Sequence, residues 1–108
     1  MKIDSATSPD GGTSCAAMLK ALADDTRLAV VRRLLARPCH VGELQAELQI
    51  EQSLLSHHLK QLREAGIVES ERDGKAVLYR LTTSVESRRR GDVIDLGCCR
   101  LSFPSKGQ

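Results

Sequence analysis

The spacing of apolar residues changes once along this chain, and that change limits the folds open to it. In QSLLSHHLKQLREAG, Leu55, Leu59 and Leu62 recur every three or four residues, which is the period of one face of an α-helix. In IVESERDGKAVLYRL, apolar and polar residues alternate on either side of an Asp73-Gly74 turn, as they do in a β-hairpin. The sequence therefore predicts a helix followed directly by a hairpin.

Three earlier segments also carry the helical period. CAAMLKALA places Met18, Leu19 and Leu22 on one stripe, and DDTRLAVVRRLLAR continues with a second amphipathic helix. In HVGEL, His40 and Glu43 have the spacing of a capping box, which indicates the start of a third helix. We therefore expect a mainly α fold with one β-hairpin.

Composition limits the size and the interior of this fold. A chain of 108 residues supports one domain, and its only aromatic residues are Tyr79 and Phe103. The core must then be built from aliphatic side chains, and a dimer would bury more apolar surface. The formal net charge of +2 is too small to indicate a nucleic-acid partner by itself.

The compartment is predicted from features that the sequence lacks. It has no apolar run long enough to cross a membrane, and residues 1–13 have no secretory h-region, so we expect a cytoplasmic protein with no membrane partner. Residues 1–13 are predicted to be a disordered tail. The four cysteines are then expected to be reactive, metal-binding or inert, because disulfides are rare in a reducing compartment.

Two short helices with a tight turn, followed by a charged hairpin, are typical of a winged helix-turn-helix. The second of these helices would place polar and basic side chains opposite its apolar stripe, where they could contact bases and phosphates. The hairpin tip would add two cations to a wing. The predicted DNA contacts are Gln52, Ser53, Ser56, His57, Lys60, Arg63, Arg72 and Lys75.

These segments together resemble the ArsR/SmtB family of bacterial repressors. The resemblance covers roughly residues 15–81, and Gln52, Ser53, Ser56 and His57 match the family's base-contacting positions. It implies a cytosolic homodimer that binds double-stranded operator DNA until an effector releases it. We assign residues 14–81 to the DNA-binding domain and residues 82–108 to a segment for dimerisation and sensing.

The same resemblance directs attention to Cys98 and Cys99 as the effector site. The family's zinc site uses histidines on a C-terminal helix, and none follows Leu81 here. A second family site uses two cysteines in a motif like ELCVCDL. The counterpart here is RPCHVGEL, in which His40 and Gly42 replace those two cysteines, so this site is broken. Some arsenite sensors of the family carry a C-terminal Cys-Cys pair with a third cysteine further on. We predict an arsenite, antimonite or soft-metal site at Cys98 and Cys99. The third ligand would come from Cys39, which is our first choice, from Cys15 or from the other subunit.

Other interpretations stay open at this point. Cys39 lies before a predicted helix, whose dipole would lower the pKa of its thiol, so a redox or persulfide switch is one alternative. A thiol or metal carrier that does not bind DNA is another, and a protein-binding winged helix is a third. No triad, Walker loop, GxGxxG or HExxH motif occurs, so we predict neither an enzyme nor an organic cofactor.

Overall fold

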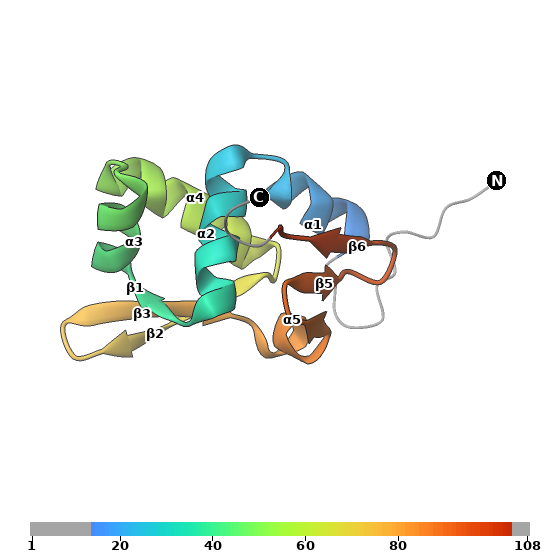
Figure 1. The fold of residues 1–108 in the computed structure, drawn as a ribbon. Helices are drawn as coiled ribbons and strands as arrows, with labels where there is room; N and C mark the ends of the chain where they lie inside the picture. The colour runs from blue at the N-terminus through green and yellow to red at the C-terminus, as the bar shows by residue number, and fades with distance from the viewer. Residues whose placement is uncertain (1–13, 105–108) are drawn as a thin grey trace.

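The fold was analysed in a computed structural model, which describes residues 14–104. Helices and a first sheet come first in the chain, and a second, smaller sheet ends it (Figure 1). The predicted N-terminal tail lies outside the described residues. The elements are α1 (Cys15–Leu22), α2 (Asp25–Ala36), β1 (Cys39–His40), α3 (Val41–Leu48), α4 (Gln52–Glu64), β2 (Val68–Asp73), β3 (Ala76–Leu81), α5 (Thr83–Ser87), β4 (Arg89–Arg90), β5 (Val93–Asp95) and β6 (Arg100–Ser102).

The first two helices begin at side-chain caps. The Ser14 hydroxyl accepts a hydrogen bond from the Ala17 amide at 3.1 Å, and the Asp24 carboxylate accepts one from the Arg27 amide at 3.0 Å. Such caps satisfy amides that have no partner in the helix. The predicted stripe on α1 is only partly correct, because Leu19 is 41% exposed. It lies too far around the helix from its buried neighbours to reach the core.

The helix-turn-helix is formed by α3 and α4, as the apolar spacing predicts. Leu55, Leu59 and Leu62 are buried on α4, and Leu44 is buried on α3. The turn between the helices is tight because Gln49 adopts a left-handed conformation, with φ of 52°. The core is aliphatic as expected, with both aromatic side chains buried at its edge.

The wing is a three-stranded sheet rather than a lone hairpin. Its order is β1-β3-β2, and β1 pairs Cys39 with Tyr79. This two-residue strand has no periodic signal of its own, so the sequence does not predict it. The hairpin turn lies at Gly74 and Lys75, one residue later than predicted, because Asp73 pairs with Ala76 as the last step of the ladder.

A second sheet follows α5, with the strand order β4-β5-β6. The alternation around LSFP predicts a short terminal strand, and β6 overlaps this stretch at Leu101 and Ser102. The other two strands are not expected from the sequence. Ile94, Leu96 and Phe103 are buried and join this sheet to the main core. Figure 1 shows the second sheet beside α1 at one end of the molecule, with α3 and the wing tip at the other. Across residues 14–104, no helix is both long and apolar enough to cross a bilayer.

Candidate nucleic-acid interface and thiol cluster

The two faces of α4 differ sharply in exposure. Its leucine stripe is buried, whereas the polar residues on the opposite face all reach solvent. The N-cap residue Glu51 makes no side-chain hydrogen bond to the first turn, which leaves amide donors available at the positive end of the helix. The exposed residues of this face are Gln52, Ser53, Ser56, His57, Lys60 and Arg63.

The C-terminal part of α4 is joined to the wing. The Arg63 guanidinium donates a hydrogen bond to the Tyr79 hydroxyl at 3.2 Å. Lys60 has only a loose ion pair with Glu64, at 4.0 Å between exposed atoms. Arg63 therefore has a structural partner, while Lys60 stays available to a phosphate. Contact of either residue with DNA stays a prediction.

The wing tip presents Arg72 and Lys75 to solvent, as predicted. The acidic residue between them has a partner, because His40 Nε2 lies 2.8 Å from an Asp73 carboxylate oxygen. This hydrogen bond, with a second contribution from Glu43, raises the pKa of His40. When His40 is protonated, it offsets the charge of Asp73 beside the two cations of the tip.

A buried histidine links α4 to the other helices. His58 is only 8% exposed, and its Nδ1 lies 3.2 Å from Arg27 Nη1. The same guanidinium donates to the Ala21 carbonyl on α1 at 2.6 Å. Burial lowers the pKa of His58, so it is neutral at pH 7 and accepts from Arg27. His58 is therefore a buried side chain with a hydrogen-bond partner.

Three cysteine thiols meet where α1 begins. The sulfurs of Cys15, Cys98 and Cys99 all lie within 4.8 Å of one another. Cys15 and Cys98 are paired as a disulfide with their Cα atoms 6.2 Å apart, and the sulfurs of Cys98 and Cys99 are 3.8 Å apart. Cys98 and Cys99 are exposed, and Cys15 is half-buried. From the sequence, Cys15 is one possible third thiolate, but Cys39 is preferred to it, and the structure places Cys15 beside the pair.

The structure corrects the role predicted for Cys39. This thiol is 1% exposed inside the β1–β3 pairing and donates weakly to the Arg37 carbonyl at 3.5 Å. Burial raises the pKa of Cys39, the opposite of the lowered value that a helix N-terminus led us to expect. Desolvation disfavours the thiolate more strongly than the nearby arginine favours it. The structure therefore does not bring Cys39 to the Cys98–Cys99 pair.

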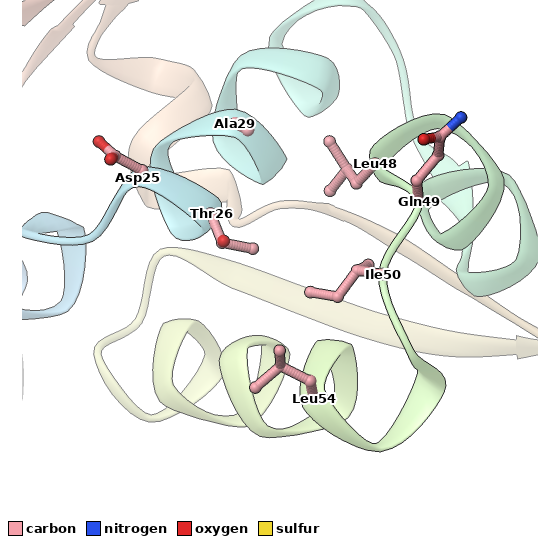
Figure 2. Close-up of a pocket in the computed structure, with 7 residues that line it drawn as sticks. All are labelled: Asp25, Thr26, Ala29, Leu48, Gln49, Ile50 and Leu54. Carbon is pink, nitrogen blue, oxygen red and sulfur yellow. The ribbon is translucent and has the colours of Figure 1, made fainter.

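An apolar pocket of about 360 Å³ lies beside the start of α4. Figure 2 shows Leu48, Ile50 and Leu54 pointing into it, opposite Thr26 and Ala29 on α2. Leu54 is 48% exposed, so the first turn of α4 rests on the core through Leu55 alone. The exposed polar face of α4 thus begins at a lightly packed turn.

This fold and this exposed helix face define a winged helix-turn-helix protein. The sequence profile described as "Bacterial regulatory protein, arsR family" matches residues 24–70, from the cap of α2 into β2. The chain belongs to this family.

Comparison with individual proteins agrees with that assignment. The Biofilm growth-associated repressor of Agrobacterium fabrum is 43% identical over 76 residues, which are 70% of this chain and 65% of that protein. HlyU from Vibrio cholerae superposes with a TM-score of 0.63 at 38% identity, over 67% of this chain and 79% of that one. The homodimeric winged helix-turn-helix DNA-binding domain Mb0332 from Mycobacterium bovis gives 0.61 at 28% identity, over 64% of each chain. The chain spans less than two thirds of the length of the first curated relatives it matches. Those relatives are named as regulators of transcription, in agreement with the prediction of a protein that is not an enzyme.

Proposed function

We propose that this chain is a homodimeric, DNA-binding transcriptional repressor whose hold on its operator weakens when a thiol-directed effector binds. The observation that carries the proposal is the exposed polar face of α4 beside a basic wing tip, in a chain of the arsR family. We expect it to act in the cytoplasm, where operator DNA is found, and to use no organic cofactor.

Each predicted contact has a chemical role at the DNA. Gln52 can pair with adenine, and Ser53, Ser56 and His57 can meet base edges from the first two turns of α4. Lys60 and Arg63 on α4, with the two cations of the wing tip, are suited to phosphates. The free amides at the start of α4 add donors for one more phosphate.

A homodimer is supported by the surface of α1 and by a structural relative. Leu19 exposes an apolar side chain on α1, where a second protomer could cover it. The Mycobacterium bovis relative is described as homodimeric. A two-fold dimer would present two copies of α4 to half-sites about 34–36 Å apart, one turn of DNA.

The effector is proposed to be arsenite, antimonite or another soft ion bound through Cys98 and Cys99. A route to the DNA face exists in the contacts already described. The cysteines sit at the start of α1, and Arg27 joins the end of α1 to His58 on α4. Coupling of ~1–3 kcal/mol per effector would lower operator affinity roughly 5- to 150-fold.

A redox or persulfide switch is the second candidate. The disulfide between Cys15 and Cys98 favours it, because the fold holds two thiols at a separation of Cα atoms that a disulfide accepts. In this version an oxidant, rather than a metal ion, changes the affinity for DNA.

Binding to the chain's own promoter region tests the proposal. Fluorescence anisotropy with the reduced protein should show binding that prefers this DNA over a scrambled sequence and weakens with salt. Arsenite or antimonite should release the DNA, and peroxide should do so instead if the redox candidate holds. Equal affinity for both sequences would overturn the repressor and leave the thiol-carrier and protein-binding alternatives.

A further inference from the structure

The thiol cluster joins two segments that are 83 residues apart in sequence. Its members come from the first turn of α1 and from the turn between β5 and β6. Among residues 14–104, this is the only group of three or more histidine, cysteine or acidic side chains arranged to hold a metal ion. A site can therefore be formed by these three thiols alone, within one protomer.

The spacing of the Cys98 and Cys99 sulfurs suits one small thiophilic ion, and reduction of the Cys15–Cys98 disulfide would free the third sulfur. Three thiolates bound to one ion at about 2.3 Å, with near-tetrahedral angles, lie about 3.8 Å from each other. The sulfurs of Cys98 and Cys99 already have that separation. Within residues 14–104 the cluster has three ligands and no fourth. This matches the trigonal pyramid that trivalent arsenic and antimony favour, whereas structural zinc sites are closed by four ligands.

The turn that carries Cys98 and Cys99 is held in place by its own hydrogen bonds. An Asp95 carboxylate oxygen accepts from the Gly97 amide at 2.8 Å, and the Leu96 amide donates to the Cys99 carbonyl at 2.9 Å. Gly97 has φ of 97°, which other residues rarely adopt. Leu96 is buried and anchors the turn to the core. The two thiols are thus preorganised toward α1.

We propose that Cys15, Cys98 and Cys99 of one protomer form a single three-thiolate site for trivalent arsenic or antimony, and that the Cys15–Cys98 disulfide is the closed, oxidised form of that site. This inference rests on the effector class in the proposed function. It replaces Cys39 by Cys15 as the third ligand and makes ion binding dependent on the redox state of the same sulfurs.

The two reactions use the same thiols and exclude each other. Arsenous acid exchanges its three hydroxyls for three As–S bonds, and each hydroxyl leaves as water with one thiol proton, so arsenic keeps its oxidation state. A peroxide instead takes two electrons from Cys15 and Cys98. One S–S bond forms, the O–O bond breaks, and the two oxygens leave as water or alcohol with the thiol protons. Oxidation leaves Cys99 as the only cluster thiol, which cannot hold the ion.

Titration of the reduced protein with arsenite, without DNA, tests the site directly. Native mass spectrometry should show one arsenic per protomer, with three fewer alkylatable thiols. Cys39→Ser is the matched control and should bind like the parent chain. Cys15→Ser, Cys98→Ser and Cys99→Ser should each bind more than about 100-fold more weakly, since removal of a ligand costs more than removal of a supporting residue. A Cys15→Ser variant that binds as tightly as Cys39→Ser would overturn the inference.

Mixed dimers test whether the site lies within one protomer. Subunits carrying Cys15→Ser are refolded with subunits carrying both Cys98→Ser and Cys99→Ser. A site within one protomer leaves these mixtures without strong arsenite binding. Restored binding, near one arsenic per mixed dimer, would show that the ligands come from two subunits and would overturn the assignment.

A redox arm completes the test. Peroxide-treated protein should lose arsenite binding and regain it after reduction by dithiothreitol, and unchanged binding would overturn the closed-site proposal. These outcomes are independent of DNA. If the chain binds arsenite but no operator DNA, the proposed repressor function is wrong and the three-thiolate site stands. If the Cys15→Ser variant binds DNA and still releases it with arsenite, the three-thiolate site is wrong and the proposed repressor stands.

Discussion

The DNA-reading part and the thiol-bearing part of this molecule are held together in different ways. Residues 14–81 contain four helices and a wing sheet around a shared aliphatic core, and the arsR profile lies inside this region, at residues 24–70. The second sheet consists of strands of two or three residues that depend on a few buried side chains. Cys15, Cys98 and Cys99 all fall outside the matched residues, whereas the buried Cys39 falls inside them. The profile thus covers the helix-turn-helix that is predicted to read DNA, and the thiol cluster lies outside the residues that the profile matches.

The largest expected effect concerns whether both parts unfold together. Leu59→Ala in α4 and Ile94→Ala in the second sheet each empty a buried site, and each should lower the free energy of unfolding by ~2–5 kcal/mol. Urea denaturation followed by circular dichroism measures this decrease. The exposed Leu54→Ala is the control and should stay within about 0.5 kcal/mol of the parent. A small decrease for Ile94→Ala would mean that the second sheet unfolds separately.

Base reading should depend on α4 and not on the second sheet. Gln52→Ala removes a side chain suited to adenine and should cost ~1–3 kcal/mol on the operator, with less effect on scrambled DNA. Anisotropy titrations on both sequences measure the difference. Asp92→Ala, an exposed change in the C-terminal segment, should leave both affinities unchanged. Equal weakening on both sequences for Gln52→Ala would remove this residue from base recognition.

The salt dependence of DNA binding should show which cations contact phosphates, those of the wing or those beside the thiol cluster. Lys75→Ala at the wing tip should make the plot of log affinity against log salt shallower by about 0.9 for each phosphate that the variant no longer neutralises. Arg100→Ala, whose side chain is 77% exposed beside the thiol cluster, should not change the slope. If Arg100→Ala changes the slope and Lys75→Ala does not, the DNA lies against the second sheet rather than the wing.

The smallest expected effects come from two histidines with opposite pKa shifts. Burial lowers the pKa of His58, so the unfolded chain binds more protons, and stability is lost as pH falls below about 6.5. The hydrogen bond to Asp73 raises the pKa of His40, so its contribution is present below about 6.5 and is lost as pH rises through the folded value. Urea midpoints from about pH 5 to pH 8 for His58→Gln and His40→Gln measure both. The difference in urea midpoint between each variant and the parent should change with pH in opposite directions for the two histidines. A change in the same direction for both would contradict the opposite pKa shifts.

Much of the DNA-reading part follows from sequence because its signals are periodic and local. Leu55, Leu59 and Leu62 fix the buried face of α4 and thereby the exposed face opposite. Leu19 shows the limit of this reasoning, since a stripe drawn too wide includes a side chain that the core does not reach. Strand β1 escapes prediction because its two residues become a strand only by pairing with β3.

The thiol cluster is predictable only in part, for a different reason. Cys98 and Cys99 are adjacent, so their pairing is local and visible in the sequence. Their third partner depends on the long-range packing of the β5–β6 turn against α1, and no periodic pattern in the sequence predicts that packing. The sequence indicates only that a third thiolate is needed, which leaves Cys15 and Cys39 as candidates. Burial favours Cys15 over Cys39, because Cys39 is enclosed by β3.

Because Cys39 is enclosed, the rate at which its thiol reacts measures how often β1 separates from β3. A thiol-reactive dye should label Cys99 alone when the disulfide is present, and the three cluster thiols after reduction. The fourth label can enter only when β1 separates from β3 and frees Cys39. The rate of that last labelling step, measured with and without DNA, would report how often the base of the wing comes apart. Tight operator binding through the wing should slow it.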